Sequence, residues 1–395
     1  MERKWDALLK WKMQEEREER PKRGTKGGIL MKKKRYVELR DRGGYPAGPL
    51  GYVCRDYMAR TTAINRANVP ESEIPADAVR LDMDYGNPDA ECKVYGWMTD
   101  DGAIKLWTNA DIIRLDDYTA EMFSNLPSVT HIDLSMFSTE GLTSTKDMFL
   151  NCKMLESVDL SGFDTTEVRD MSGMFCGCES LRAIDLSPIS FRNAENVSAM
   201  FRGCSDLTSI DLSWKDMSET RDISWMFYGC ERLDSIKLEG IYASEIRDMG
   251  WMFAGCLSLR EIDISQLGTS KNEKMTGMFA ECAGLKSLDL SGIDTSETSS
   301  MAYMFEGCEN LKEINLSGVD TSRVTDMECM FKGCKALEKL DISEFDVSSV
   351  CHARNILKGC SGLREINAPA EWQIPMQKIL EKNEKKREER EERDI

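Results

Sequence analysis

The sequence contains no long hydrophobic run. No segment of its 395 residues approaches the ~20 consecutive apolar residues that a transmembrane helix needs. About half of the first thirty residues are charged, and no apolar core of ~7–15 residues follows them, so no secretory signal is visible. From these absences we expect a cytoplasmic chain without a transmembrane segment.

Histidine is almost missing as well, with only His131 and His352 in the whole chain. No Ser/His/Asp set, glycine-rich phosphate loop or carboxylate pair stands out from the background. A lone histidine is far more often solvated than catalytic. We therefore expect no enzymatic activity, no cofactor and no metal site.

Positive charge is scarce outside the N-terminal segment. The net charge is −17, yet residues 1–60 carry seventeen Lys/Arg against nine Asp/Glu. Residues 374–395 hold seven of each sign, so residues 61–373 carry about −25. Such a body repels phosphates, and we expect no nucleic acid to bind it.

The most regular feature of the sequence is a Met-Phe dipeptide that recurs every 26 residues. Ile356-Leu357 continues the series after nine copies. A fixed period of this length is typical of a solenoid. The methionines are Met122, Met148, Met174, Met200, Met226, Met252, Met278, Met304 and Met330.

Each 26-residue unit has the same sequence of signals. Aspartates such as Asp170 stand four residues before Met, where a carboxylate can cap a helix, and glycines such as Gly177 stand three after it, suited to a helix stop. The alternation Ile-Asp-Leu-Ser at 184–187 then indicates a short strand. The pattern predicts an α/β repeat: a right-handed leucine-rich-repeat-like solenoid of about ten coils, each with a short helix and a short parallel β-strand.

The unit MFEGCENLKEINLSGVDTSRVTDM (Met304–Met327) and its nine relatives resemble the BspA-type leucine-rich repeat, also found in Mycoplasma lipoproteins. The resemblance covers residues 121–368, and VYGWMTDDGAIKLW (Val94–Trp107) is similar to the segment that leads into such arrays. Members of that family are typically bacterial surface proteins associated with adhesion. The resemblance therefore implies a cell-surface or secreted protein as the alternative to a cytoplasmic one.

A cysteine stands four residues after Met in nine of the ten units, from Cys152 to Cys360. Stacked cysteines point the same way, whereas a disulfide needs converging Cβ vectors and zinc needs four ligands around one point. The column therefore indicates small buried thiols. Cys176, Cys329 and Cys351 fall outside the column, and we expect them to be more exposed.

An outward strand position forms an acidic column beside a serine column. Its aspartates include Asp159, Asp185, Asp211, Asp263 and Asp289, and Lys237 interrupts it. Like charges one strand apart repel, so two interpretations stay open. Either each carboxylate bonds neighbouring serine hydroxyls or backbone amides, or the column is an acidic face for a basic partner, a glycan or a cation.

Aromatic residues break the repeat in one region. Trp225, Trp251 and Tyr303 directly precede their methionines, and Tyr228 and Trp214 lie nearby. Tryptophan and tyrosine are favoured binding anchors. These five residues are either binding candidates or a cover over neighbouring coils.

We divide the chain into a basic N-terminal segment (1–92), a cap (93–121), the solenoid (122–373) and a charged helical tail (374–395). The first hypothesis for function is a monomeric, non-enzymatic binding module that presents an acidic surface to a protein or glycan. The alternative is an intracellular scaffold that recruits a partner through its basic N-terminal segment.

Overall fold

The computed structural model describes residues 36–38, 60–81, 91–115 and 120–391. Backbone contacts divide the chain into two compact units, Met1–Lys34 and Arg35–Ile395. All described residues belong to the second unit. Most of the basic N-terminal segment, residues 1–35, 39–59 and 82–90, lies outside the described residues.

Two small sheets precede the array. The first has the order β3-β4-β5-β2-β7, with β4 antiparallel to its two neighbours and β2 parallel to β5 and β7. The second is parallel, with the order β1-β6-β8. Their strands are β1 (Tyr36–Glu38), β2 (Ala63–Arg66), β3 (Val79–Arg80), β4 (Val94–Met98), β5 (Ala103–Thr108), β6 (Ile112–Arg114), β7 (His131–Ile132) and β8 (Phe137–Ser138). Since β7 and β8 belong to the first 26-residue unit, the array continues these sheets.

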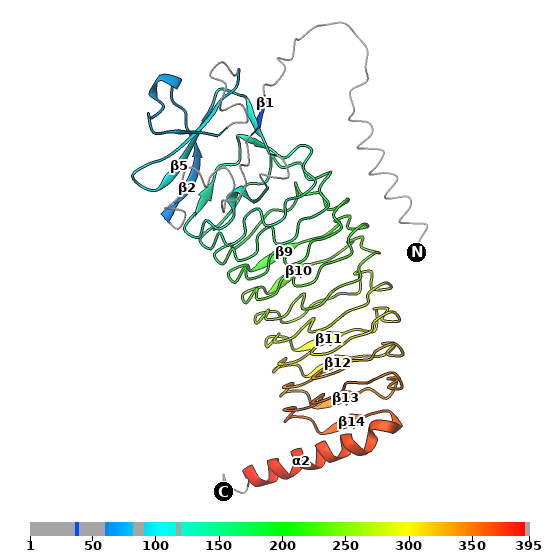
Figure 1. Cartoon of the computed structure of the whole chain (residues 1–395). Coiled ribbons are helices and arrows are strands. Elements are labelled where there is room, and N and C mark those ends of the chain that lie inside the picture. Colours follow the sequence, from blue (N-terminus) through cyan, green and yellow to red (C-terminus); the bar gives the residue numbers. More distant parts are fainter. Residues whose placement is uncertain (1–35, 39–59, 82–90, 116–119, 392–395) are drawn as a thin grey trace, which may run out of the picture. The chain divides into compact units, whose positions relative to one another are not determined.

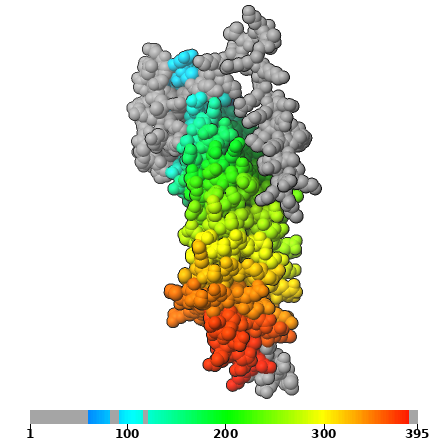
Figure 2. Space-filling view, turned by 90° about the vertical axis from the view of Figure 1, so that its right-hand side faces the viewer, coloured from blue at the N-terminus to red at the C-terminus, as the bar shows by residue number. Residues whose placement is uncertain are grey.

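The 26-residue units stack as coils in parallel register (Figure 1). Ile210 of β9 pairs with Ile236 of β10, one period apart, and the β11–β12 and β13–β14 pairs have the same offset. A second ladder of parallel bridges runs from Ser144 to His352 at the same period. The strands are β9 (Ser209–Asp211), β10 (Ser235–Lys237), β11 (Ser287–Asp289), β12 (Glu313–Asn315), β13 (Lys339–Asp341) and β14 (Glu365–Asn367). This is a leucine-rich-repeat-like fold, and its coils follow one another as coloured bands in Figure 2.

The core is a set of columns that run from coil to coil. The Met, Phe, Cys and Leu positions are buried along the array. Successive phenylalanine rings from Phe123 to Phe331 stack with centroids 5.1–6.0 Å apart and planes inclined by 2–18°. One coil cannot enclose its own apolar side chains, so the stacking itself creates the core.

The predicted helix around each Met-Phe pair is wrong for the coils from Met148 onward. The residue directly before each methionine, or before Ile356 in the last coil, has φ between 53° and 63°, from Asp147 to Asn355. The residue three positions after each methionine, or after Ile356, is left-handed too. Left-handed residues break an α-helix, and the amides bond the next coil instead. For example, Phe253 N–H donates to the Met278 carbonyl oxygen over 2.9 Å. Helical turns in the described array are short: η4 (Ala120–Phe123) lies at its start, and η5 (Ala370–Trp372) follows β14. A further turn, η3 (Glu71–Glu73), lies between β2 and β3.

The predicted aspartate caps have a related role. The Asp170 carboxylate accepts the Ser172 backbone N–H over 2.9 Å, and Asp222, Asp248 and Asp326 each accept the amide two residues on. The carboxylate therefore satisfies a free amide, as predicted, but in a turn rather than at a helix start.

The last coil is followed by α2 (Gln373–Glu391), in the segment for which the charge pattern predicts a helix. The side-chain amide of Asn383 donates to the Cys360 carbonyl oxygen over 2.8 Å, and Met376 is buried against the coil. Among the described residues, no helix combines the length and the apolar character needed to cross a bilayer.

Candidate binding surfaces

Four of the five aromatic candidates form one continuous group, here called the aromatic ridge: Trp225, Tyr228, Trp251 and Tyr303. The Trp225 and Trp251 rings stack with centroids 5.4 Å apart and planes inclined by 20°. Trp251 in turn stacks on Tyr303 at 6.1 Å, and Tyr228 lies 4.8 Å from Trp225. The sequence pattern and the structure thus agree that these residues belong together.

The backbone holds three ridge residues in an unfavourable conformation. Trp225, Trp251 and Tyr303 have φ of 61°, 59° and 60°. Left-handed backbone costs a bulky L-residue roughly 1–2 kcal/mol. The equivalent position in the other coils holds glycine or a smaller side chain: Asp147, Gly173, Ala199, Gly277, Cys329 and Asn355. The ladder imposes this conformation, because each residue's amide donates to the next coil, as Trp251 N–H does to the Thr276 carbonyl oxygen over 2.8 Å. An aromatic side chain at such a site costs more backbone energy than glycine would.

Gly277 explains how Trp251 reaches a ring two coils away. A Cβ atom on Gly277 would lie 2.5 Å from Cδ2 of the Trp251 indole. The indole therefore occupies the space that a side chain at residue 277 would fill, and Tyr303 lies beyond it. The adjoining Ala254 and Ala280 are buried.

Arg202 was missed by the sequence analysis. Its guanidinium carbon lies 5.4 Å from the ring centroids of both Trp225 and Tyr228. A cation over two aromatic faces is attracted by their quadrupoles. The available signal was its place in the column two residues after Met, where Tyr228 stands one coil later.

The opposite end of the ridge is acidic. Burial, reinforced by the nearby Glu328 and Glu306, raises the pKa of the Tyr303 hydroxyl above its ordinary value. Glu306 also forms an ion pair with Lys332 of the next coil, with Nζ and Oε1 2.5 Å apart. The ridge therefore has a cation at one end, ring edges along its middle and a carboxylate at the other end.

Trp214 occupies a different place in its coil, in the turn after β9. Its side chain is 53% exposed, and its ring lies against Gly240 of the next coil. The neighbouring Lys215 replaces an apolar residue of the repeat, and its ammonium group donates to the Leu186 and Ile189 carbonyl oxygens over 2.7 and 3.0 Å. Burial lowers the pKa of that lysine. Trp214 and Lys215, which depart from the repeat in this turn, therefore both make contacts within the chain.

The acidic column is exposed, and its carboxylates are bonded within the chain. Each aspartate accepts the backbone N–H of the serine two residues on; Ser161 donates to Asp159 over 2.9 Å, and Asp185, Asp211, Asp263 and Asp289 repeat the contact. Hydrogen bonds from the Ser161 amide and hydroxyl hold the pKa of Asp159 below its ordinary value. The carboxylates of the column are therefore hydrogen-bonded to backbone amides of their own coil, as in the first of the two interpretations.

The middle of this strand face is hollowed into an acidic groove. The groove has a volume of about 780 Å³ and is lined by β10 to β12. Lys237 partly neutralises its edge through an ion pair with Asp211 at 3.2 Å. Among the described residues, no group of three His, Cys, Asp or Glu side chains is placed to hold a metal ion. The acidic side chains in the lining are Asp234, Glu261, Asp263, Asp289 and Glu313.

The thiol column is buried and its cysteines are free. Each Sγ donates to the carbonyl oxygen of a phenylalanine in the preceding coil, as Cys178 does to Phe149 over 3.2 Å. Burial raises the pKa of Cys152 and of Cys308 to about 12. Cys351 is exposed as expected, but the expectation for Cys329 is wrong, because packing between coils buries it.

The stacked coils and their periodic core define a repeat protein with leucine-rich-repeat-like coils. The family described as "Mycoplasma protein of unknown function, DUF285" matches residues 118–240, 221–315 and 286–386, and the chain belongs to it. Comparison with curated proteins gives no match.

Among solved structures, the chain is similar to TLR13 in its complex with ssRNA13. The identity is 19% and the TM-score 0.28, over 65% of this chain and 40% of that one. It is also similar to a chain of the Toll–Spatzle complex of Drosophila, at 15% identity and a TM-score of 0.30, over 66% of this chain and 33% of that one. The chain thus spans less than half the length of either structure.

Proposed function

We propose that this protein is a non-enzymatic binding module whose partner is a protein that docks on the aromatic ridge. The observation that carries the proposal is the placement of Trp225, Trp251 and Tyr303 at left-handed positions where the other coils have glycine or a small side chain (alanine, cysteine, aspartate or asparagine). Stability alone favours glycine at such positions. Aromatic residues held there at a cost to stability point to recognition.

The geometry favours a protein over a glycan. Sugars commonly stack on exposed ring faces, but the faces of Trp225 and Trp251 are turned toward each other. What remains for a ligand is a row of ring edges beside the Arg202 guanidinium. Such a surface matches the aromatic and arginine anchors of protein interfaces.

Affinity capture with three forms of the protein tests this proposal. The baits are the wild type, a Trp225→Ala/Tyr228→Ala/Trp251→Ala variant and a control Asp159→Asn/Asp185→Asn variant. We expect quantitative mass spectrometry to find proteins that the wild type and the control retain and the aromatic variant loses. Equal capture by all three baits, or loss only with the aspartate variant, would contradict the assignment. A glycan array with the same baits tests the glycan alternative.

The resemblance to BspA-type repeats extends the proposal to adhesion at a cell surface. Fractionation of the source cells, with surface proteolysis, tests this extension separately. A wholly cytosolic pool would favour the scaffold hypothesis, in which the basic segment 1–92 recruits the partner.

A further inference from the structure

The Met-Phe ladder has a direction. From the coil of Met148 onward, four alternate amides of each coil donate to four alternate carbonyls of the following coil. In the last complete pair of coils the donors Met327, Cys329, Phe331 and Gly333 bond the carbonyl oxygens of His352, Arg354, Ile356 and Lys358 over 2.7–3.0 Å. Every coil therefore needs a successor to accept its amides.

The last coil has no successor. The amides of Ala353, Asn355, Leu357 and Gly359 occupy the donor positions, and no residue of the described chain accepts a hydrogen bond from them. A row of parallel N–H groups with left-handed residues in it, here Asn355 and Gly359, forms a concave site for oxygen acceptors. The end of the array is thus a line of four free donors.

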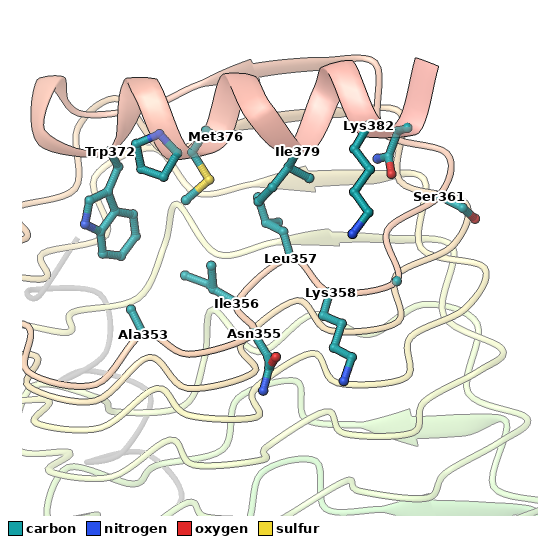
Figure 3. Close-up of a pocket in the computed structure, with 13 residues that line it drawn as sticks. Ala353, Asn355, Ile356, Leu357, Lys358, Ser361, Trp372, Met376, Ile379 and Lys382 are labelled. Atoms are coloured by element: carbon teal, nitrogen blue, oxygen red, sulfur yellow. The ribbon is translucent and has the colours of Figure 1, made fainter. Parts of the chain in front are cut away.

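These four residues line a groove of about 770 Å³ between the last coil and α2. Figure 3 shows Trp372, Met376 and Ile379 of η5 and α2 directed toward the coil that carries Ile356 and Leu357. None of the groove's lining residues is acidic, although the whole chain carries −17; Lys358 and Lys382 supply its charge. The groove therefore combines backbone donors, an apolar wall and two cations.

We propose that this groove binds an acidic peptide segment of a partner protein, which continues the ladder in the conformation of one more coil. In the native ladder alternate carbonyls of one coil meet alternate amides of its neighbour, so a peptide that adopts the conformation of a coil presents one oxygen to each of the four donors. A small anion would meet one or two donors and leave the apolar wall uncovered. The surface is separate from the aromatic ridge, so the proposal does not depend on the proposed function.

The array itself indicates the register of such a segment. In the native ladder the carbonyls of Ser300, Ala302, Met304 and Glu306 accept from the preceding coil. Glu306 lies two residues after Met, the place in its coil that Lys358 holds in the last one. A docked segment with glutamate at this place brings the carboxylate beside Lys358, as Glu306 lies beside Lys332.

An acetylated and amidated peptide with the sequence of residues 299–308, carrying Cys308→Ser, is the probe. At about 1 mM peptide we expect amide hydrogen exchange over residues 353–359 to slow at least tenfold, as hydrogen-bonded amides are protected. The full-length Lys358→Glu/Lys382→Glu variant should bind the peptide at least tenfold more weakly. Lys385→Glu, a lysine of α2 outside the groove, is the matched control and should bind as the wild type does.

Three outcomes overturn the proposal. The first is no protection at that concentration, and the second is equal protection by a scrambled peptide. The third is self-association of the wild-type chain in sedimentation that the Lys358→Glu/Lys382→Glu variant abolishes and the peptide does not compete with. That result would assign the groove to a second copy of the chain.

Discussion

The Sγ atom of Cys256 donates a hydrogen bond to the carbonyl oxygen of Phe227, across one coil boundary, over 3.2 Å. Both residues are fully buried. This carbonyl also accepts the Cys230 backbone N–H over 3.1 Å, and the thiol, which is small enough to enter the core beside it, is its second donor. The same contact recurs along the array, which explains why the position carries cysteine rather than alanine.

Cys256→Ala should lower the free energy of unfolding by about 1–2 kcal/mol, because it removes a buried hydrogen bond and leaves a small cavity. Urea denaturation followed by circular dichroism measures the change. Cys351→Ala, at an exposed cysteine, is the control and should stay within about 0.5 kcal/mol of the wild type. Equal effects of the two substitutions would remove the structural role of the thiol column.

The thiols also make stability depend on alkaline pH. Burial raises the pKa of Cys152 and Cys308 to about 12 in the folded state, whereas an unfolded thiol titrates near ~8.5. The unfolded state thus loses protons first, so the thiol contribution is complete below pH ~8.5 and declines as pH rises toward 12. We expect the urea midpoint to fall above pH ~9. Replacement of Cys152 and Cys308 by alanine should reduce that slope, and an unchanged slope would exclude these thiols as its source.

Phe253→Ala tests the stacked core. The Phe253 ring is fully buried between Phe227 and Phe279, with centroids 5.8 and 5.5 Å away. Its removal should cost roughly 3–5 kcal/mol and allow the coils on either side to melt separately, because each coil contacts only its neighbours. Differential scanning calorimetry should then resolve two transitions. The control Leu257→Ala, at a 44% exposed side chain, should leave one transition near the wild-type midpoint; a single unchanged transition for Phe253→Ala would contradict this core.

The sequence predicted the coil period and its columns because burial imposes a fixed pattern on every unit. Met, Phe, Cys and Leu occupy the positions at which they are buried. The helix prediction failed because Asp170 and Gly177 suit a helix as well as a turn. What decides between them is the hydrogen bonding of Phe175 N–H to Met200 in the next coil, a contact that no local signal encodes.

The aromatic ridge was predictable only in part. Trp225, Tyr228, Trp251 and Tyr303 stand out as departures from the repeat. That Arg202 lies over two of the rings depends on side-chain direction, which the repeat period does not specify. Likewise, the ion pairs that join neighbouring coils, such as Arg247 with Glu273 at 3.1 Å, offset part of the repulsion expected from the net charge.

Gly277→Ala should disrupt the ridge. The added Cβ would lie 2.5 Å from the Trp251 ring, so the indole must move and its stacking on Tyr303 must weaken. Gly318→Ala is a matched control, because Gly318 also has positive φ, 75° against 61°, but nothing within 4 Å of the added atom. Both should lose about 1 kcal/mol of stability from the left-handed backbone, while only Gly277→Ala shifts the tryptophan fluorescence. Identical spectra for the two variants would show that Trp251 does not rest on Gly277.

The ridge and the acidic column should contribute differently to partner binding. Exposed carboxylates give long-range attraction that salt screens, whereas specific affinity needs anchors that lose their water. Alanine at Trp225, Tyr228 and Trp251 should therefore weaken the partner's affinity by more than ~2 kcal/mol in total, chiefly through faster dissociation. Asp159→Asn with Asp185→Asn should instead slow association and flatten its salt dependence, since these aspartates are exposed and already bonded to Ser161 and Ser187. Surface plasmon resonance at two ionic strengths separates the two effects. If the aspartate variant abolishes binding while the aromatic variant binds normally, the acidic column is the site and the ridge only covers its neighbouring coils.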